Sequence, residues 1–201
     1  MPLLEVLERE LGRFQLELDP KQISTLARYC DELVRWNTKI NLTGLKNAEL
    51  VRRLVVEPAW IAKKLKLSGT LADIGSGNGS PAIPLHVVSE MSATHLIEAR
   101  TRRAAFLRHV VSVLKLEHAV VHRTRLEEVV DELGTLDWVS LQGVALTAEL
   151  LEAIKKISVS TTRVVWITAD PEPPVPPVQT LRLPSTNTEV LIFRLGLRDL
   201  S

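Results

Sequence analysis

The residues from Asp73 to Gly79, DIGSGNG, combine an acid with three glycines at alternate positions, and Pro81 and Pro84 follow them. Glycine reaches backbone conformations closed to other residues, and its missing side chain lets a ligand lie against the main chain. A helix beginning near Pro81 would point free N–H groups and its positive dipole end at that ligand. The pattern predicts a binding loop for a flat or anionic ligand at the carboxyl end of a strand, where open α/β sheets bind their ligands.

Two ligand classes compete for this loop. Dinucleotide sites use G-x-G-x-x-G, whereas this chain has G-x-G-x-G, with Ser80 where the third glycine of that pattern would stand. The form D-x-G-x-G-x-G resembles the first motif of S-adenosylmethionine-dependent methyltransferases. This resemblance implies that the loop backbone contacts the methionine portion of the cofactor and that the acid orients it. The cofactor-loop residues predicted on this basis are Asp73, Gly75, Ser76, Gly77 and Gly79.

A second acid is expected about 20 residues further on, at the end of the next strand, to hold the two ribose hydroxyls. Glu98 follows the β-like run THLI and meets this expectation. A carboxylate can accept both hydroxyl hydrogen bonds together. The alternative is a surface acid that pairs with Arg100 or Arg102.

After residue 69, short β-like runs alternate with helical runs, which is typical of βαβ units and a parallel sheet. The proline-rich segment 170–179 predicts an extended linker. Segments 178–183 and 190–195 predict a terminal antiparallel hairpin. The other strands are predicted over 70–74, 94–98, 119–122, 136–141 and 162–168, and the helices over 81–90, 101–115, 126–132 and 147–157.

The first 68 residues are predicted to be helical. Asp19 and Pro20 suit the N-cap and first position of a helix that ends near Asn37, with Gln22 completing a capping box. A further apolar stripe over 50–65 is interrupted by Pro58, which should kink or break it. We therefore expect a helical cap over 1–68 and a sheet domain over 69–201.

Composition bounds the class of protein. Hydrophobic residues make up 45% of the chain, and no apolar run approaches the roughly 20 residues of a membrane span. The N-terminus has acids within its apolar pattern, which argues against a signal peptide. The single Cys30 cannot form an intramolecular disulfide, so we expect a reducing compartment, the cytoplasm. We expect no membrane partner.

Charge is unevenly distributed although the net charge is only +1. The window from Arg35 to Lys66 holds eight basic residues against two acids, and the window from Arg100 to Arg125 holds seven against one. Such windows either bind phosphates or form solvated helix faces. Composition alone leaves both interpretations open.

Four stretches together resemble the bacterial 16S rRNA guanine-N7 methyltransferase family, once called glucose-inhibited division protein B. They are RWNTKINLTGL, DIGSGNGSPAIPL, LIEARTRRAAFLRHV and HRTRLEEV, and the resemblance runs from about residue 20 to 145. It implies an α/β fold with a Rossmann-like class I methyltransferase sheet, mostly parallel with a terminal antiparallel hairpin, and an N-terminal helical extension. It also implies S-adenosylmethionine as cofactor, and ribosomal RNA or the small ribosomal subunit as partner.

Site residues carry over position by position from this resemblance. Asn41 matches an asparagine that faces the catalytic pocket, and Arg125 lies near the target, so both are candidate catalytic residues. The remaining cofactor residues are Glu98 and Ala99 at the ribose end and Leu126 and Glu127, which with Arg125 flank adenine.

The implied chemistry needs no strong base. Guanine N7 carries a lone pair and no proton, so methyl transfer depends on in-line positioning and desolvation. Cys30 lies on a predicted core stripe, which argues against a cysteine nucleophile. The chain has no amine-methylation tetrad, and its five histidines lack metal-ligand spacing, so no metal is expected.

The chain departs from the family pattern on its substrate side. Gln142 stands where the family has an arginine, Thr168 where it has a lysine, Leu54 where it has a histidine and Ser80 where phenylalanine is common. The helix between the fifth and sixth strands is replaced by the segment 170–179. Two alternatives therefore remain beside the active enzyme: an impaired or repurposed relative that binds RNA or protein, and a methyltransferase for a non-RNA substrate.

Overall fold

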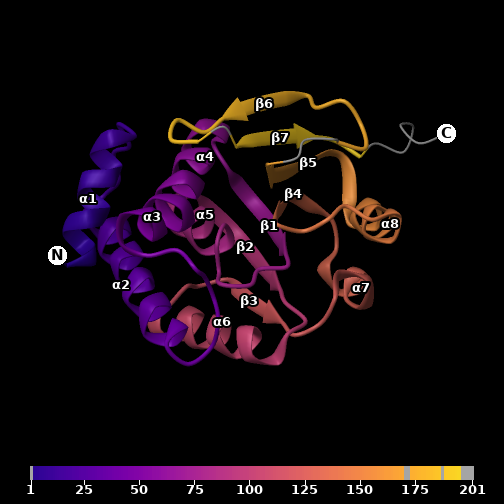
Figure 1. The fold of residues 1–201 in the computed structure, drawn as a ribbon. Coiled ribbons are helices and arrows are strands. Elements are labelled where there is room, and N and C mark those ends of the chain that lie inside the picture. Colours follow the sequence, from indigo (N-terminus) through magenta and orange to yellow (C-terminus); the bar gives the residue numbers. More distant parts are fainter. Residues whose placement is uncertain (1, 170–172, 187, 196–201) are drawn as a thin grey trace.

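The computed structural model describes residues 2–169, 173–186 and 188–195, and its strands form one seven-stranded sheet in the order β3-β2-β1-β4-β5-β7-β6 (Figure 1). β1 to β5 pair in parallel, and β7 runs antiparallel to both β5 and β6. The predicted α/β sheet with a terminal antiparallel hairpin is confirmed. The strands are β1 Ser68–Ile74, β2 Glu90–Ile97, β3 Ala119–His122, β4 Leu136–Gln142, β5 Ser158–Thr168, β6 Gln179–Arg182 and β7 Glu189–Phe193.

The strand order changes direction at β1, which lies between β2 and β4. The chain leaves β1 toward β2 on one side and later returns to place β4 on the other. The connections therefore diverge beside the carboxyl end of β1 and leave a crevice there, which is the ligand position in open α/β sheets. The glycine loop follows β1 directly and so lies in this crevice.

Helices cover both faces of the sheet (Figure 1). On one face, α5 (Ala82–Val88) and α6 (Thr101–Leu114) share a hydrophobic cluster with the N-terminal helices. On the other face, α7 (Val130–Leu133) and α8 (Ala148–Lys156) pack with a second cluster. Because both faces of the central strands are buried, β1 and β4 are mostly apolar, with Asp73 and Ser140 as buried polar exceptions.

The N-terminal cap is built by α1 (Leu3–Arg13) and α2 (Pro20–Asn37) together with the helical run that follows them. The predicted capping box of α2 is present: Gln22 N donates to Asp19 Oδ1 at 2.8 Å, and Asp19 N donates to Gln22 Oε1 at 3.2 Å. The cap shares one continuous core with a face of the sheet. The predicted division at residues 68 and 69 coincides with the start of β1 and stays a prediction as a domain boundary.

The helical run around Pro58 is divided into α3 (Asn47–Val51), the π-helical turn η1 (Arg52–Val56) and α4 (Glu57–Leu65). Pro58 lies in the first turn of α4, where its missing N–H is tolerated. The interruption expected at Pro58 is thus absorbed by the wider turn just before it. π-helical turns are frequent at functional sites.

Several predicted elements differ in detail. β2 begins four residues before the predicted 94–98 and ends before Glu98. The helix predicted over 126–132 is a 3₁₀ turn, η2 (Leu126–Glu128), followed after Val129 by the short α7. β5 begins four residues earlier than predicted. Within the segment 170–179, residues 170–172 lie outside the described residues, and residues 173–178 form no helix. Val175 is buried in the same cluster as Trp166 of β5, so this segment covers part of the sheet face.

Candidate functional site

The glycine loop has the backbone conformation that its sequence predicts. Gly75, Gly77 and Gly79 all have positive φ values, of 72°, 52° and 91°. A Cβ atom on Gly75 would lie 2.7 Å from Val144 Cγ2. At Gly75 only glycine satisfies both the left-handed conformation and the close approach of the loop after β4.

The N–H groups of this loop are largely used by the chain itself, which the sequence interpretation did not anticipate. Gly75 N and Ser76 N both donate to Ile97 O, at 2.9 and 3.0 Å, and Gly79 N donates to Ser76 O at 2.6 Å. The following helix α5 is only seven residues long. A ligand would therefore lie along the glycine surface, with less access to free amides than expected.

Glu98 lies directly after β2 and is 5% exposed. Its Oε2 accepts from Gly77 N at 3.0 Å and its Oε1 from Arg100 N at 2.7 Å. No ion pair joins it to an arginine side chain among the described residues, so the surface-pair alternative is wrong. Each oxygen keeps a further lone pair, so the carboxylate is fixed in place and can still accept two more hydrogen bonds.

Asp73 is buried beneath the loop at the end of β1. Ser140 of β4 donates to its Oδ1 at 2.6 Å, and Ser76 Oγ donates to its main-chain oxygen at 2.9 Å. Its Oδ2 is buried and has no hydrogen-bond partner among the described residues. Burial raises the pKa of Asp73 to about 7; hydrogen bonding by Ser140 and Ser76 opposes this shift, and the nearby charge of Glu98 adds to it.

The N-terminal cap holds the glycine loop from above. Tyr29 of α2 donates its hydroxyl to Asn78 O at 2.8 Å. Asn78 Nδ2 donates to Leu42 O at 3.4 Å. Asn37 in turn fixes the loop after α2, because its Oδ1 accepts from Leu42 N at 2.8 Å and from Thr43 N at 3.0 Å. The segment WNTKINLT thus acts through Asn37 to place Leu42 over the glycine loop.

Two cavities flank Gly75, which lines both. The Glu98 cavity, of about 220 Å³, lies toward β2 and β3. It is lined by residues of the segments 97–100 and 124–127, together with Ile74, Gly75, Val144 and Leu150. The Asn78 cavity, of about 140 Å³, lies toward the cap and is lined by Leu42, Leu54, Gly75, Ser76, Gly77, Asn78, Ser80, Arg103 and Gln142.

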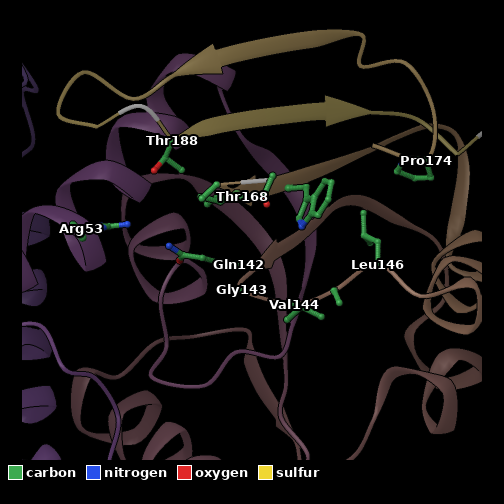
Figure 2. A pocket seen from close by; sticks show the side chains of 12 residues that line it. Arg53, Gln142, Gly143, Val144, Leu146, Thr168, Pro174 and Thr188 are labelled. Carbon is green, nitrogen blue, oxygen red and sulfur yellow. The ribbon is translucent and has the colours of Figure 1, made fainter. Parts of the chain in front are cut away.

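A larger cavity of about 740 Å³ lies at the carboxyl ends of β4 and β5 (Figure 2). This β4–β5 cavity shares Gln142 with the Asn78 cavity and Val144 with the Glu98 cavity. Its walls come from η1, the loop after β4, the end of β5, Pro174 and Thr188. The three cavities therefore adjoin one another around the loop that follows β1.

Most of the sequence-predicted residues meet here. Ala99, Arg125, Leu126 and Glu127 line the Glu98 cavity, and Ser76 and Gly77 line the Asn78 cavity. Arg125 is exposed on the Glu98 side and does not line the β4–β5 cavity. Asn41 is exposed and lines none of these three cavities, although its neighbour Leu42 does. The catalytic roles of Asn41 and Arg125 stay predictions.

Sequence reasoning missed several residues of the site. Arg53, Arg103 and Val144 line the cavities, and Tyr29 and Ser140 hold the loop and its acid. Arg53 and Arg103 lie in the two basic windows, which was the only sequence signal for them. Tyr29 and Ser140 looked like ordinary helix and strand residues, because only the packing brings them to the loop.

The fold and this arrangement of cavities define a methyltransferase-like α/β protein. The precorrin-6Y C5,15-methyltransferase of Geobacter metallireducens is similar in structure, with a TM-score of 0.55 over 78% of this chain and 91% of that chain, at 16% identity. The ribosomal protein L11 methylase of Lactobacillus delbrueckii gives a TM-score of 0.52 over 75% and 80%, at 13% identity. Such low identities establish the fold alone.

Sequence comparison narrows the class to one family. The family model for rRNA small subunit methyltransferase G matches residues 22–171, and the chain belongs to this family. The ribosomal RNA small subunit methyltransferase G of Chloroflexus aggregans is 33% identical over 67% of this chain and 58% of its own length. That of Wolinella succinogenes is 29% identical over 80% and 82%. The chain thus matches less than two thirds of the length of some of its relatives.

No group of three or more His, Cys, Asp or Glu side chains among the described residues is arranged to hold a metal ion. No helix in that part of the chain is long and apolar enough to cross a membrane.

Proposed function

We propose that this chain binds S-adenosylmethionine and methylates N7 of a guanine in small-subunit ribosomal RNA. Family membership supports the reaction class, and the buried, backbone-anchored Glu98 beside the glycine loop is the observation that carries the proposal. A ribosomal RNA substrate also implies a cytoplasmic location.

The residues present fit this cofactor. Glu98 has two free lone pairs for the 2′ and 3′ ribose hydroxyls, and Gly75 lets the ligand pass between the two cavities. Ala99, Leu126 and Glu127 would border the adenine in the Glu98 cavity. The methionine portion would enter the Asn78 cavity, where the Arg103 guanidinium suits its carboxylate.

Asp73 also fits a positively charged ligand. Its Oδ2 is buried and has no hydrogen-bond partner within the described part of the chain, and its ionised form is disfavoured chiefly by burial and also by the charge of Glu98. A cation above the loop would favour the carboxylate. The pKa of Asp73 would then fall toward its ordinary range when the cofactor binds.

When bound, S-adenosylmethionine would supply an electrophilic methyl group on a sulfonium, and the sulfur would keep the electron pair of the broken C–S bond. Because guanine N7 attacks with its own lone pair, the protein has no proton to remove. The chain's task is positioning: the β4–β5 cavity receives the base, and Gln142 stands where this cavity meets the Asn78 cavity. Asn41 and Arg125 are proposed to complete the contacts to the nucleotide.

The test incubates the purified chain and methyl-labelled S-adenosylmethionine with small ribosomal subunits, and separately with naked 16S rRNA, from cells lacking this gene. We expect label in 7-methylguanosine, identified by nucleoside mass spectrometry, and none in large-subunit RNA. A chain that binds the cofactor but labels no ribosomal RNA would overturn the proposal. RNA binding without methylation would instead favour the alternative of an impaired or repurposed relative. The absence of basic residues at positions 142 and 168 is the observation that supports this alternative.

A further inference from the structure

The β4–β5 cavity lacks the cations that the family resemblance implies for it. Gln142 and Thr168 stand where an arginine and a lysine were expected. Among the described residues that line this cavity, Arg53 alone carries a charge. If the cavity receives a nucleotide, this chain must recognise it with a different set of groups.

Gln142 occupies the position at which the base and the cofactor portion would meet, because it lines both the β4–β5 cavity and the Asn78 cavity. Ser80 Oγ donates to Gln142 Oε1 at 3.5 Å. Ser80 is itself placed by the loop, since its backbone N donates to Asn78 Oδ1 at 3.0 Å. Two departures from the family pattern, Ser80 and Gln142, are therefore in contact with each other.

In the structure the oxygen end of the Gln142 amide faces Ser80. A primary amide accepts at its oxygen and donates twice from its nitrogen. With Oε1 facing Ser80, the free end of Gln142 is Nε2, which has no acceptor among the described residues. Figure 2 shows the nitrogen of Gln142 directed toward the η1 side of the cavity. The cavity wall thus presents a neutral hydrogen-bond donor.

Guanine offers a matching acceptor. Its Hoogsteen edge carries N7 and O6, both acceptors. N7 must keep its lone pair for the reaction, so O6, its neighbour on the same edge, is the atom left for recognition. Adenine carries an N6 amino donor at that place, which would face the donor of Gln142 without forming a bond.

Arg53 supplies the charge. It projects from the π-helical turn η1 into the same end of the cavity as Gln142 (Figure 2). Its guanidinium makes no hydrogen bond or close ion pair with the described residues. The acid four residues along, Glu57, is buried and accepts a hydrogen bond from Ser185. Burial raises the pKa of Glu57, and the nearby charges of Arg53 and Arg52 oppose this rise, so Arg53 interacts with Glu57 through charge but not through a hydrogen bond. An arginine with unused donors beside a base pocket suits a phosphate group.

We propose that Gln142, oriented by Ser80, is the specificity-determining residue that donates from Nε2 to O6 of the target guanine, and that Arg53 binds a phosphate of the same RNA segment. This inference rests on the proposed function. It assigns base recognition to a neutral amide and phosphate binding to the N-terminal cap, in place of the missing arginine and lysine.

The first test pairs a protein change with a base change. Once the methylated guanine is mapped, small-subunit RNA is prepared by ligation with guanine, inosine or 2-aminopurine at that position. Inosine keeps O6, whereas 2-aminopurine lacks it. For the wild type we expect kcat/KM to be similar for guanine and inosine and about tenfold lower for 2-aminopurine.

Gln142→Ala should lower kcat/KM for the guanine RNA about tenfold. For this variant, kcat/KM for the 2-aminopurine RNA should be almost the same as for the guanine RNA. Ser80→Ala should give a smaller loss of the same kind. Gln179→Ala is the matched control, since Gln179 is an exposed amide on β6. An equal penalty for 2-aminopurine in wild type and Gln142→Ala would overturn the assignment to O6.

The second test addresses Arg53. Arg53→Gln should weaken RNA binding and lower the slope of log affinity against log salt by about one, while Arg53→Lys should restore part of the affinity. Arg182→Gln, which removes an exposed charge on β6, should leave the slope unchanged. An unchanged slope in Arg53→Gln would overturn its phosphate role.

Calorimetry with S-adenosylhomocysteine separates this inference from the function beneath it. Affinity for this ligand should stay within about twofold of wild type in the Arg53 variants, because Arg53 does not line the Glu98 or Asn78 cavity. If the wild type methylates ribosomal RNA and Gln142→Ala does so equally well, the proposed function stands and the inference fails. If the wild type labels no ribosomal RNA, both fail together.

Discussion

Replacing Glu98 by glutamine tests the centre of the proposed cofactor site with a nearly isosteric change. In the structure the two carboxylate oxygens accept from Gly77 N and Arg100 N. An amide has only one acceptor oxygen. In either orientation of the amide, Glu98→Gln therefore sets an NH₂ group against a backbone N–H, of Gly77 or of Arg100, and it removes the negative charge.

The size of the effect follows from the hydrogen bonds at risk. A hydrogen bond to a charged group contributes about 1.5–3 kcal/mol. At about 1.4 kcal/mol per factor of ten, losing one such bond weakens binding by about 10- to 150-fold. Because Glu98 is 5% exposed, water cannot replace the missing acceptor.

The assay is calorimetric titration of wild type and Glu98→Gln with S-adenosylhomocysteine and with its 2′,3′-dideoxy analogue. The wild type should prefer the hydroxylated ligand, and the variant should lose most of that preference. This comparison separates a ribose contact from a mere loosening of the loop, which would weaken both ligands equally. Glu90→Gln is the control, because Glu90 is an exposed acid at the opposite end of the same strand.

Binding of S-adenosylhomocysteine within twofold of wild type in Glu98→Gln would refute the ribose role. A preserved preference for the hydroxylated ligand would refute it as well, even if overall affinity fell. In that case Glu98 would serve only to tie the glycine loop to the chain after β2.

Three further predictions concern the loop and its supports. In the cofactor-free chain burial raises the pKa of Asp73 from 3.8 to about 7, so the folded state keeps a proton that the unfolded state releases between about pH 4 and 7. The unfolding free energy, measured by urea unfolding, should therefore fall as pH rises through this window, by up to about 4 kcal/mol. The Asp73→Asn variant should show a weaker dependence of unfolding free energy on pH. A wild-type pH dependence no steeper than that of the variant would contradict this prediction. Gly75→Ala should lower the unfolding free energy by about 1–3 kcal/mol and abolish calorimetric binding of S-adenosylhomocysteine. Adding Val144→Ala should remove the steric clash but leave the backbone strain, so stability should recover only in part. Full recovery would show that the positive φ value of Gly75 is unimportant. Tyr29→Phe leaves Asn78 O without its buried donor. The variant should therefore lose about 1 kcal/mol of stability and bind S-adenosylhomocysteine more weakly. A melting temperature equal to that of the wild type would show that the cap does not stabilise the glycine loop through Tyr29.

The sequence by itself determined most of the helices and strands and singled out the residues of the proposed cofactor site. Alternation of apolar runs with amphipathic stretches gave the parallel sheet, since side-chain periodicity is a local property. The capping box of α2 was legible for the same reason, because Asp19 and Gln22 interact within one turn. The three glycines were identifiable because tight turns have local backbone requirements that few residues meet, and Glu98 because it follows the next predicted strand about 20 residues further on.

Only the tertiary structure brings together the residues of the proposed substrate site. Ser80 and Gln142 are 62 residues apart in sequence, and Arg53 reaches the same cavity from the N-terminal cap, so no spacing rule connects them. The burial of Asp73 Oδ2, which has no hydrogen-bond partner among the residues that the structure describes, likewise depends on which strands cover it. The π-helical turn could not be predicted either. Pro58 indicates that the helix is interrupted, but it does not indicate which neighbouring residues change their conformation. Local patterns thus specify where the chain turns, whereas long-range packing decides which side chains face one another across the resulting cavity.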